Sequence, residues 1–278
     1  MSKRRPEHGL PPALFYNEKE AQKYASNSRL AQVQSEIAER ALELLSLPKD
    51  EPCFILDIGC GSGLSGEVLS ENGHHWVGID ISKAMLDVAA EKEVEGGLLL
   101  GDVGCGLPFR PGSFQGAISV SVLQWLCNAE EKSQDAMKRL RRFFASLYAC
   151  LSRGSTAALQ FYPENAQQVE VITRQAMKAG FSGGVVVDYP ESTRAKKIYL
   201  VLFTGGFRQL PNALTAESRV QTECSVNERM RTSGRKIKRK PSKKSREWIL
   251  KKKEQARRRG KTVTRDSKYT GRKRRERF

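Results

Sequence analysis

The stretch Ile55-Leu56-Asp57-Ile58-Gly59-Cys60-Gly61-Ser62-Gly63 decides the fold of this 278-residue chain. An apolar strand that runs into a glycine-rich turn is how a doubly wound α/β domain begins a pocket for an adenosine-containing cofactor. A second apolar run, His75–Ile79, ends on Asp80, and a third, Gly97–Leu100, is followed by Asp102. The order of these segments predicts a mostly parallel sheet with such a pocket.

Two classes of cofactor compete for the glycine-rich turn. Residues 61–66 satisfy the pattern G-x-G-x-x-G of dinucleotide-binding turns, and Asp80 lies near the expected position of a ribose-binding acid. Asp57, however, lies inside the strand end, where a carboxylate would repel a pyrophosphate and attract a cofactor that carries an ammonium and a sulfonium. S-adenosylmethionine (SAM) is such a cofactor, and Asp57 favours it over a nicotinamide dinucleotide.

The turn itself is predicted to hold the methionine part of SAM. Gly59, Gly61 and Gly63 let the backbone approach the ligand closely and lead into a helix whose N-terminus favours a carboxylate. Asp57 is expected to assist the ammonium, either by its charge or through a water molecule.

The two later acids are predicted to hold the adenosine part. Asp80 is expected to accept both ribose hydroxyls, with Ile81 packed on the adenine face. Asp102 is expected to accept the exocyclic amine of adenine, with the Val103 backbone beside it. The alternative for both acids is a local role in a turn or a helix cap.

Hydrophobic periodicity predicts the remaining elements. One helix is expected from Glu18 to Leu47, another capped by Ser82, and a long one capped by Ser133. The basic residues of this long helix are interpreted as a solvated face, with RNA contact as the alternative: Lys138, Arg139, Arg141 and Arg142. Strands are expected at Cys53–Ile58, His75–Ile79, Gly97–Leu100, Phe114–Val120 and Thr156–Phe161, followed by an antiparallel hairpin of Val185–Val187 and Ile198–Phe203.

Charge is distributed very unevenly. The segment Arg229–Phe278 holds 24 of the 48 Lys and Arg and 4 of the 31 Asp and Glu, so its net charge is +20 and that of the other residues is −3. A polycation of this kind favours RNA as a partner or acts as a nuclear import signal. We therefore predict four parts: an N-terminal lid segment (1–50), a cofactor-binding domain (51–204), a linker (205–234) and a basic tail (235–278).

The six cysteines indicate no metal site. They are scattered, and none belongs to a C-x-x-C pair, so a structural zinc is not expected in this chain. Cys127 lacks an adjacent base and is interpreted as a small buried hydrophobe rather than a nucleophile. No apolar run reaches the length of a membrane helix.

Several segments carry a resemblance to one family. The turn at 56–63 looks like motif I of the class I SAM-dependent methyltransferases. Further segments resemble the eukaryotic small-subunit (18S) rRNA guanine-N7 methyltransferases: Arg5-Pro6-Glu7-His8, residues 12–16, 80–87 and 124–129, Tyr162-Pro163-Glu164-Asn165 and residues 269–274. The likeness spans the chain and is weakest over 205–235. It implies a Rossmann-like, mostly parallel seven-stranded sheet with helices on both faces.

The resemblance also implies the reaction. Guanine N7 has an in-plane lone pair and no proton, so methyl transfer to it needs alignment rather than a general base. Gln124, Trp125 and Tyr16 are the candidates that position the base, by a hydrogen bond, by stacking and by closing a lid. The alternative for Trp125 is core packing.

Partners and location follow from the same resemblance. It implies small-subunit rRNA in the pre-ribosome as substrate, in pre-40S biogenesis, and a small zinc-binding adaptor protein as heterodimer partner. The predicted strand Gly97–Leu100, with three leucines, is the candidate edge for that adaptor. We expect the chain in the nucleus, in nucleoplasm and nucleolus, with some in the cytoplasm.

Two other functions remain open at this stage. One is a tRNA or small-molecule methyltransferase, because this fold does not determine the substrate. The other is a ribosome-assembly factor whose scaffold role outweighs catalysis.

Overall fold

The computed structural model describes residues 6–48, 51–127, 135–206 and 208–215, together with residues 246, 249–250, 252–253, 257, 262–267 and 270. The chain forms two compact units, Met1–Arg219 and Val220–Phe278, and each is described by itself. Most of the predicted linker and basic tail, and Ser133, lie outside the described residues. The four-part division predicted from composition stays a prediction.

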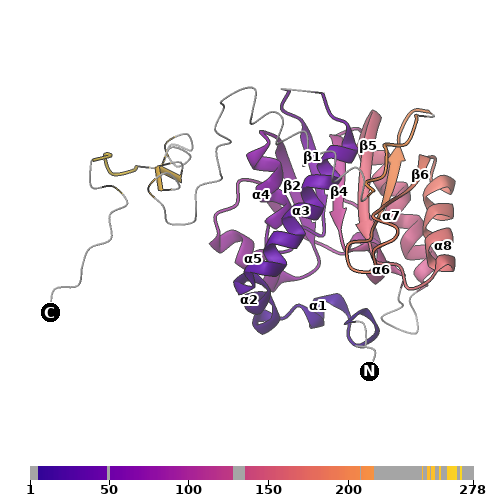
Figure 1. The fold of residues 1–278 in the computed structure, drawn as a ribbon, viewed down its shortest axis with the longest axis horizontal. Coiled ribbons are helices and arrows are strands. Elements are labelled where there is room, and N and C mark those ends of the chain that lie inside the picture. The colour runs from indigo at the N-terminus through magenta and orange to yellow at the C-terminus, as the bar shows by residue number, and fades with distance from the viewer. Residues whose placement is uncertain are drawn as a thin grey trace. The chain divides into compact units, whose positions relative to one another are not determined.

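In the described part of the first unit, seven strands form one sheet in the order β3-β2-β1-β4-β5-β7-β6 (Figure 1). The first five strands pair in parallel, whereas β7 is antiparallel to both β5 and β6, which confirms the mostly parallel sheet. The bounds are β1 Phe54–Ile58, β2 His75–Asp80, β3 Gly97–Leu100, β4 Phe114–Val120, β5 Leu151–Phe161, β6 Ser182–Asp188 and β7 Lys197–Phe203.

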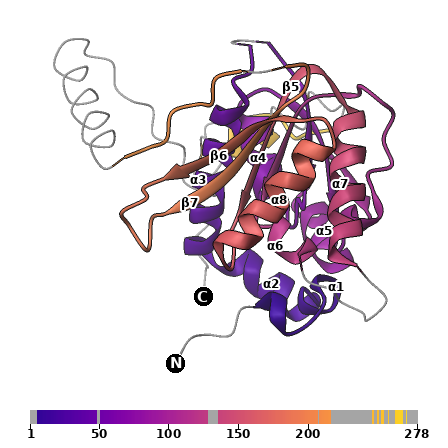
Figure 2. The ribbon, with the colours of Figure 1, turned by 90° about the vertical axis from the view of Figure 1, so that its right-hand side faces the viewer.

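Helices cover both faces of the sheet, because successive apolar residues of the buried strands point to opposite faces. Ile55 belongs to the core under α3 (Ser28–Leu45), and Leu56 belongs to the core under α7 (Ala136–Cys150). Figure 2 shows α3 on one side of the sheet and α7 and α8 on the other. The remaining helices of the sheet domain are α4 Leu64–Glu71, α5 Lys83–Glu91, α6 Leu123–Leu126, α8 Ala166–Lys178 and the short 3₁₀ helix η2 Val103–Cys105.

The single helix predicted from Glu18 to Leu47 is wrong. Asn27 divides it into α2 (Glu18–Ser26) and α3, because its backbone is extended and its side chain accepts a hydrogen bond from the Leu30 amide. Asn side chains compete with the helical backbone in this way and favour caps. The split separates α3 from α2 and from the helices that precede α2 in the chain, η1 (Pro6–His8) and α1 (Pro12–Phe15).

Further boundaries differ from the prediction, among them the N-termini of α7 and β5. The cap of α7 is Asp135, whose carboxylate accepts from the Met137 amide, and not Ser133. Strand β5 begins at Leu151 instead of Thr156, because the chain leaves α7 directly into pairing with Phe114. Neither shift moves an element to another face of the sheet.

Candidate functional site

A pocket opens at the carboxyl ends of β1, β2, β3 and β4. The strand order reverses between β1 and β4 here, and such switch points are where open α/β sheets bind ligands. Helices α1 and α2 lie below these strand ends in Figure 1 and close the pocket from that side. Its wall includes eight of the predicted site residues: Tyr16, Gly59, Gly61, Asp80, Ile81, Asp102, Val103 and Trp125.

The glycine-rich turn forms the floor of the pocket. Gly59 has φ +70°, and a Cβ there would lie 2.1 Å from Cγ2 of Val122 on the loop after β4. Gly61 also has positive φ, +51°. Gly63, which is not part of the pocket wall, has φ +82° and caps α4. Glycine is favoured at these positions because other residues are strained at positive φ and their Cβ would crowd neighbouring side chains.

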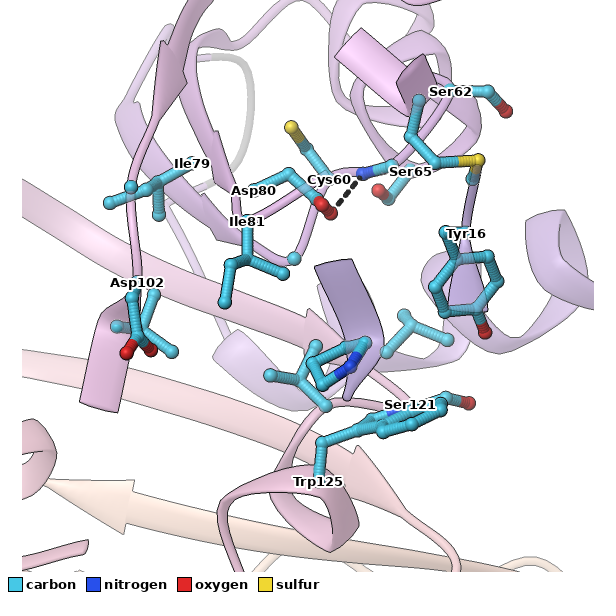
Figure 3. Close-up of a pocket in the computed structure, with 18 of the residues that line it drawn as sticks. Tyr16, Cys60, Ser62, Ser65, Ile79, Asp80, Ile81, Asp102, Ser121 and Trp125 are labelled. Atoms are coloured by element: carbon cyan, nitrogen blue, oxygen red, sulfur yellow. Dashed lines mark hydrogen bonds between the residues drawn. The ribbon is translucent and has the colours of Figure 1, made fainter. Parts of the chain in front are cut away.

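Asp80 ties the turn to the second strand. Its Oδ2 accepts from the Gly61 amide at 2.9 Å (Figure 3), and its Oδ1 accepts from the Ser82 amide at 2.8 Å. Burial raises the pKa of this carboxyl, although hydrogen bonds from backbone amides oppose that rise. The two bonds leave lone pairs on both oxygens, which suits the predicted bidentate contact with ribose hydroxyls.

Asp57 lies behind the pocket wall rather than in it. It is completely buried, and Ser65 on α4, which does line the pocket, donates to its Oδ2 at 2.6 Å. The other oxygen, Oδ1, has no hydrogen-bond partner among the described residues. Burial raises the pKa of Asp57 to about 7, and the Ser65 bond only partly offsets this effect. A buried carboxylate with an open lone pair is a plausible counter-charge for an ammonium in the pocket.

Asp102 caps η2 and pairs with Arg139. Its Oδ1 accepts from the Gly104 amide at 2.8 Å, and the Arg139 guanidinium contacts both oxygens. The cap is the local role weighed above, and it coexists with a place in the pocket wall. The interpretation of Arg139 as part of a solvated face is wrong, because this side chain is buried and turned toward the pocket. Ile81 lies near Asp102 in Figure 3, and Val103 also belongs to the pocket wall.

Aromatic side chains roof the pocket. Tyr16 and Trp125 have ring centroids 5.8 Å apart, and Tyr24 meets Tyr16 edge to face at 6.3 Å. Ser82 fixes this roof, because its hydroxyl donates to the Tyr16 carbonyl at 2.7 Å and also caps α5. Burial raises the pKa of Tyr16 to about 12, so its hydroxyl stays protonated and serves as a donor.

Gln124 does not line the pocket. It is buried, and its side-chain oxygen accepts from the Tyr162 amide at 3.4 Å. Successive residues of a helix point about 100° apart, so only Trp125 of this pair faces the pocket. The candidate role of Gln124 as a base-positioning residue is therefore replaced by a structural one at the end of β5.

The wall also contains residues that were not predicted, among them Ser65, Ser121 and Arg139. Ser121 has φ +62°, and Gln160 holds it by accepting from both its amide and its hydroxyl. A strained non-glycine residue in a pocket is a common sign of a functional site. The sequence offers no local signal for it, since Gln160 lies 39 residues away.

Chemistry that needs a metal or a thiolate finds no support in the described residues. Among them, no group of three or more His, Cys, Asp or Glu side chains could hold a metal ion. Burial raises the pKa of Cys127 to about 12, so its thiol stays protonated. Of the helices in the described part, none is long and apolar enough to span a membrane.

Strand β3 is an edge strand, as predicted, but its leucines are not uniformly exposed. Leu98 and Leu99 pack against the two cores, and Leu100 is 54 % exposed. The free edge of the strand therefore presents backbone groups and one leucine, rather than a strip of three.

Family models and curated relatives match this chain. A family model described as "Methyltransferase domain" matches residues 56–159, and one described as "Methyltransferase involved in Williams-Beuren syndrome" matches residues 202–276. The 18S rRNA (guanine-N(7))-methyltransferase of Mus musculus is 58 % identical, with 99 % of this chain and 98 % of the relative covered. The 18S rRNA (guanine(1575)-N(7))-methyltransferase of Saccharomyces cerevisiae is 49 % identical, with 99 % of both chains covered.

Solved structures agree on the fold. Haemonchus contortus phosphoethanolamine N-methyltransferase 2, in complex with SAM, has a TM-score of 0.52 at 17 % identity and covers 74 % of this chain and 61 % of its own. The methyltransferase from a complex with the Haloferax volcanii Trm112 methyltransferase activator has a TM-score of 0.50 at 18 % identity, with 67 % and 98 % covered. At such identities the likeness concerns the fold alone.

Proposed function

Because this chain belongs to the family of 18S rRNA (guanine-N(7))-methyltransferases, we propose that it transfers a methyl group from SAM to N7 of a guanine in small-subunit rRNA. The main support is that relatives of that name align with this chain over nearly the full length of both proteins. The pocket of this chain also contains residues of the glycine turn together with Asp80 and Asp102. The family inferred from the motifs is thereby confirmed.

The residues present fit SAM. Gly59 and Gly61 form the floor of the pocket with positive φ, and a buried carboxylate oxygen of Asp57 lies behind it with no described partner. Asp80 would hold the ribose, and Asp57 with Ser65 would provide negative charge near the ammonium. When bound, SAM supplies an electrophilic methyl group on a sulfonium sulfur.

The protein's own contribution is alignment. The reacting guanine nitrogen carries no proton, so no base is needed, and holding two reactants in line accounts for a large part of such a rate enhancement. Trp125 offers a ring face for stacking, and Tyr16 offers a protonated hydroxyl from the opposite side of the roof.

Calorimetry with SAM and mapping of N7-methylguanine in 18S rRNA test this function. Asp80→Lys puts a cation where ribose hydroxyls are held, so SAM binding should be lost and the modification should be absent in cells that carry only this variant. Exposed Asp87→Lys is the matched control and should retain both. Undetectable SAM binding by the wild-type protein with its adaptor present, or unchanged N7-methylguanine in cells lacking the protein, would contradict the proposal.

A scaffold role is separated from catalysis by the same variant. If the Asp80→Lys protein still supports small-subunit production while the modified base is missing, assembly is the essential duty. The role in pre-40S biogenesis and the nuclear location are part of our proposal, and the +20 charge of residues 229–278 supports both.

A small zinc-binding adaptor is proposed to pair with the edge of β3. The unpaired backbone of an edge strand is a template for strand addition, and Leu100 adds an exposed apolar contact. The structurally similar Haloferax volcanii chain comes from a complex with a methyltransferase activator. Leu100→Lys should weaken co-purification, whereas Val33→Lys on α3 should not. Equal co-purification of both variants would refute this placement.

A further inference from the structure

Arg139 is the buried cation of the pocket wall. The basic neighbours on the same helix, Lys138, Arg141 and Arg142, are exposed, whereas Arg139 is 8 % exposed and lines the pocket with Asp102. Its Nη1 lies 2.9 Å from Oδ2 of Asp102, and its Nη2 lies 3.1 Å from Oδ1. A bidentate pair of this kind determines the plane of the carboxylate as well as its position.

The other contacts of Asp102 leave one acceptor position for a ligand. Oδ1 also accepts from the Gly104 amide at 2.8 Å, and among the described residues the second donor to Oδ2 is the Cys105 thiol at 3.4 Å. A carboxylate offers about four lone-pair directions, and a thiol is a weak donor. A ligand amine can therefore replace the thiol on Oδ2 without disturbing the three stronger bonds.

Gly104 gives independent evidence that the position of Arg139 is specified. A Cβ at residue 104 would lie 2.5 Å from Cζ of Arg139 and 2.7 Å from its Nε and Nη2. The guanidinium thus lies directly against the backbone of η2, in space that only glycine leaves free. The same short helix carries Asp102 at its N-terminus, so Arg139 holds the acid and the helix together.

We infer that Arg139 is a positioning residue that aims the Asp102 carboxylate at the 6-position of the purine and so makes the site select an amino over an oxo group there. Adenine has a donor at this position, and hypoxanthine has an acceptor that a carboxylate repels. This inference rests on the proposed function, because it takes the adenine of SAM as the ligand.

The test compares S-adenosylhomocysteine with S-inosylhomocysteine, its hypoxanthine analogue, by calorimetry on the full chain with its adaptor. The wild-type protein should prefer the adenine compound by about 10- to 100-fold, the size of one charge-assisted hydrogen bond. Arg139→Lys keeps the charge and removes the fork, and Gly104→Ala displaces the guanidinium at unchanged charge. Both should bring the preference below about threefold, whereas Arg142→Lys, the exposed control, should keep the wild-type preference.

A double variant separates positioning from direct contact with the base. In an Asp102→Ala background the preference should already be lost, and adding Arg139→Lys should change it no further. The inference is overturned if Arg139→Lys keeps the wild-type preference, or weakens both ligands equally at an unchanged melting temperature. Failure of the wild-type protein to bind S-adenosylhomocysteine would instead overturn the proposed function, and this inference with it.

Discussion

Replacing Asp57 with Asn should weaken the pH dependence of SAM binding in the acidic range. Burial raises the pKa of Asp57 to about 7 in the ligand-free protein, and Ser65 is its one described hydrogen-bond partner. An ammonium in the adjacent pocket favours the ionised carboxylate and so lowers this pKa on binding. Linkage then requires that wild-type affinity rises with pH, because SAM binding releases the proton of Asp57.

The size of the effect follows from the two pKa values. If binding returns Asp57 to the ordinary range near 3.9, SAM affinity rises about 50-fold between pH 5 and pH 7, which corresponds to about 2 kcal/mol. This is an upper limit, since a partial return gives a smaller rise. The range ends at pH 7 because the α-amino group of SAM itself titrates at about pH 7.7–8.0.

Calorimetry of wild-type protein and Asp57→Asn at pH 5, 6 and 7 measures this slope. Asp80, whose pKa is also raised by burial, is present in both proteins, so the difference between the slopes belongs to Asp57. Equal slopes in the two proteins, or a wild-type affinity that falls as pH rises, would refute the reasoning.

Three further predictions concern stability and RNA. Because its folded pKa is raised, Asp57 should cost the ligand-free protein up to about 4 kcal/mol as pH rises from about 4 through 7, and urea unfolding should show that Asp57→Asn removes this loss. Gly59→Ala should lower both stability and SAM affinity, because its Cβ would lie 2.1 Å from Val122. Gly73→Ala is the control, since this residue also has positive φ but nothing lies within 4 Å of its Cβ, so it measures the backbone strain alone, about 1–2 kcal/mol. Similar melting temperatures of the two variants would contradict the clash. Deleting residues 235–278 should leave the dissociation constant for SAM unchanged. It should also reduce the slope of log affinity for rRNA against log salt concentration, by about 0.9 per lost phosphate contact on duplex RNA, by analogy with DNA. Equal RNA affinity and equal slope in both forms would mean that the tail serves import alone.

Local signals predicted most of the fold. The strand bounds of β3 and β4 agree with the prediction, and Ser82 caps α5 as expected. These features depend on residues a few positions apart, since alternation of apolar side chains and capping hydrogen bonds act over short stretches. The helix break at Asn27 was missed, because an Asn side chain that caps a helix and one that points to solvent leave the same periodic pattern around them.

The site was predicted in outline and not in its contacts. The glycine turn, Asp80 and Asp102 reach one pocket because parallel strands end at one edge of the sheet. Gln124 and Trp125 are neighbours in the sequence, but the orientation of α6 in the fold turns only Trp125 into the pocket. Whether a residue of a short helix faces a pocket depends on how the helix packs, which the sequence does not state.

By itself, the sequence determined the fold class, the cofactor and the family. The features that identify them are contiguous segments, namely the glycine turn with an acid in its strand and the motifs at the two termini. Only the tertiary structure decided the electrostatics of the pocket. Asp57 acquires a pKa near neutrality from burial under α4, and Arg139 meets Asp102 across 37 residues. Desolvation and ion pairing depend on which side chains the packing of α4 and α7 brings against the sheet edge, and that packing is a property of the whole domain.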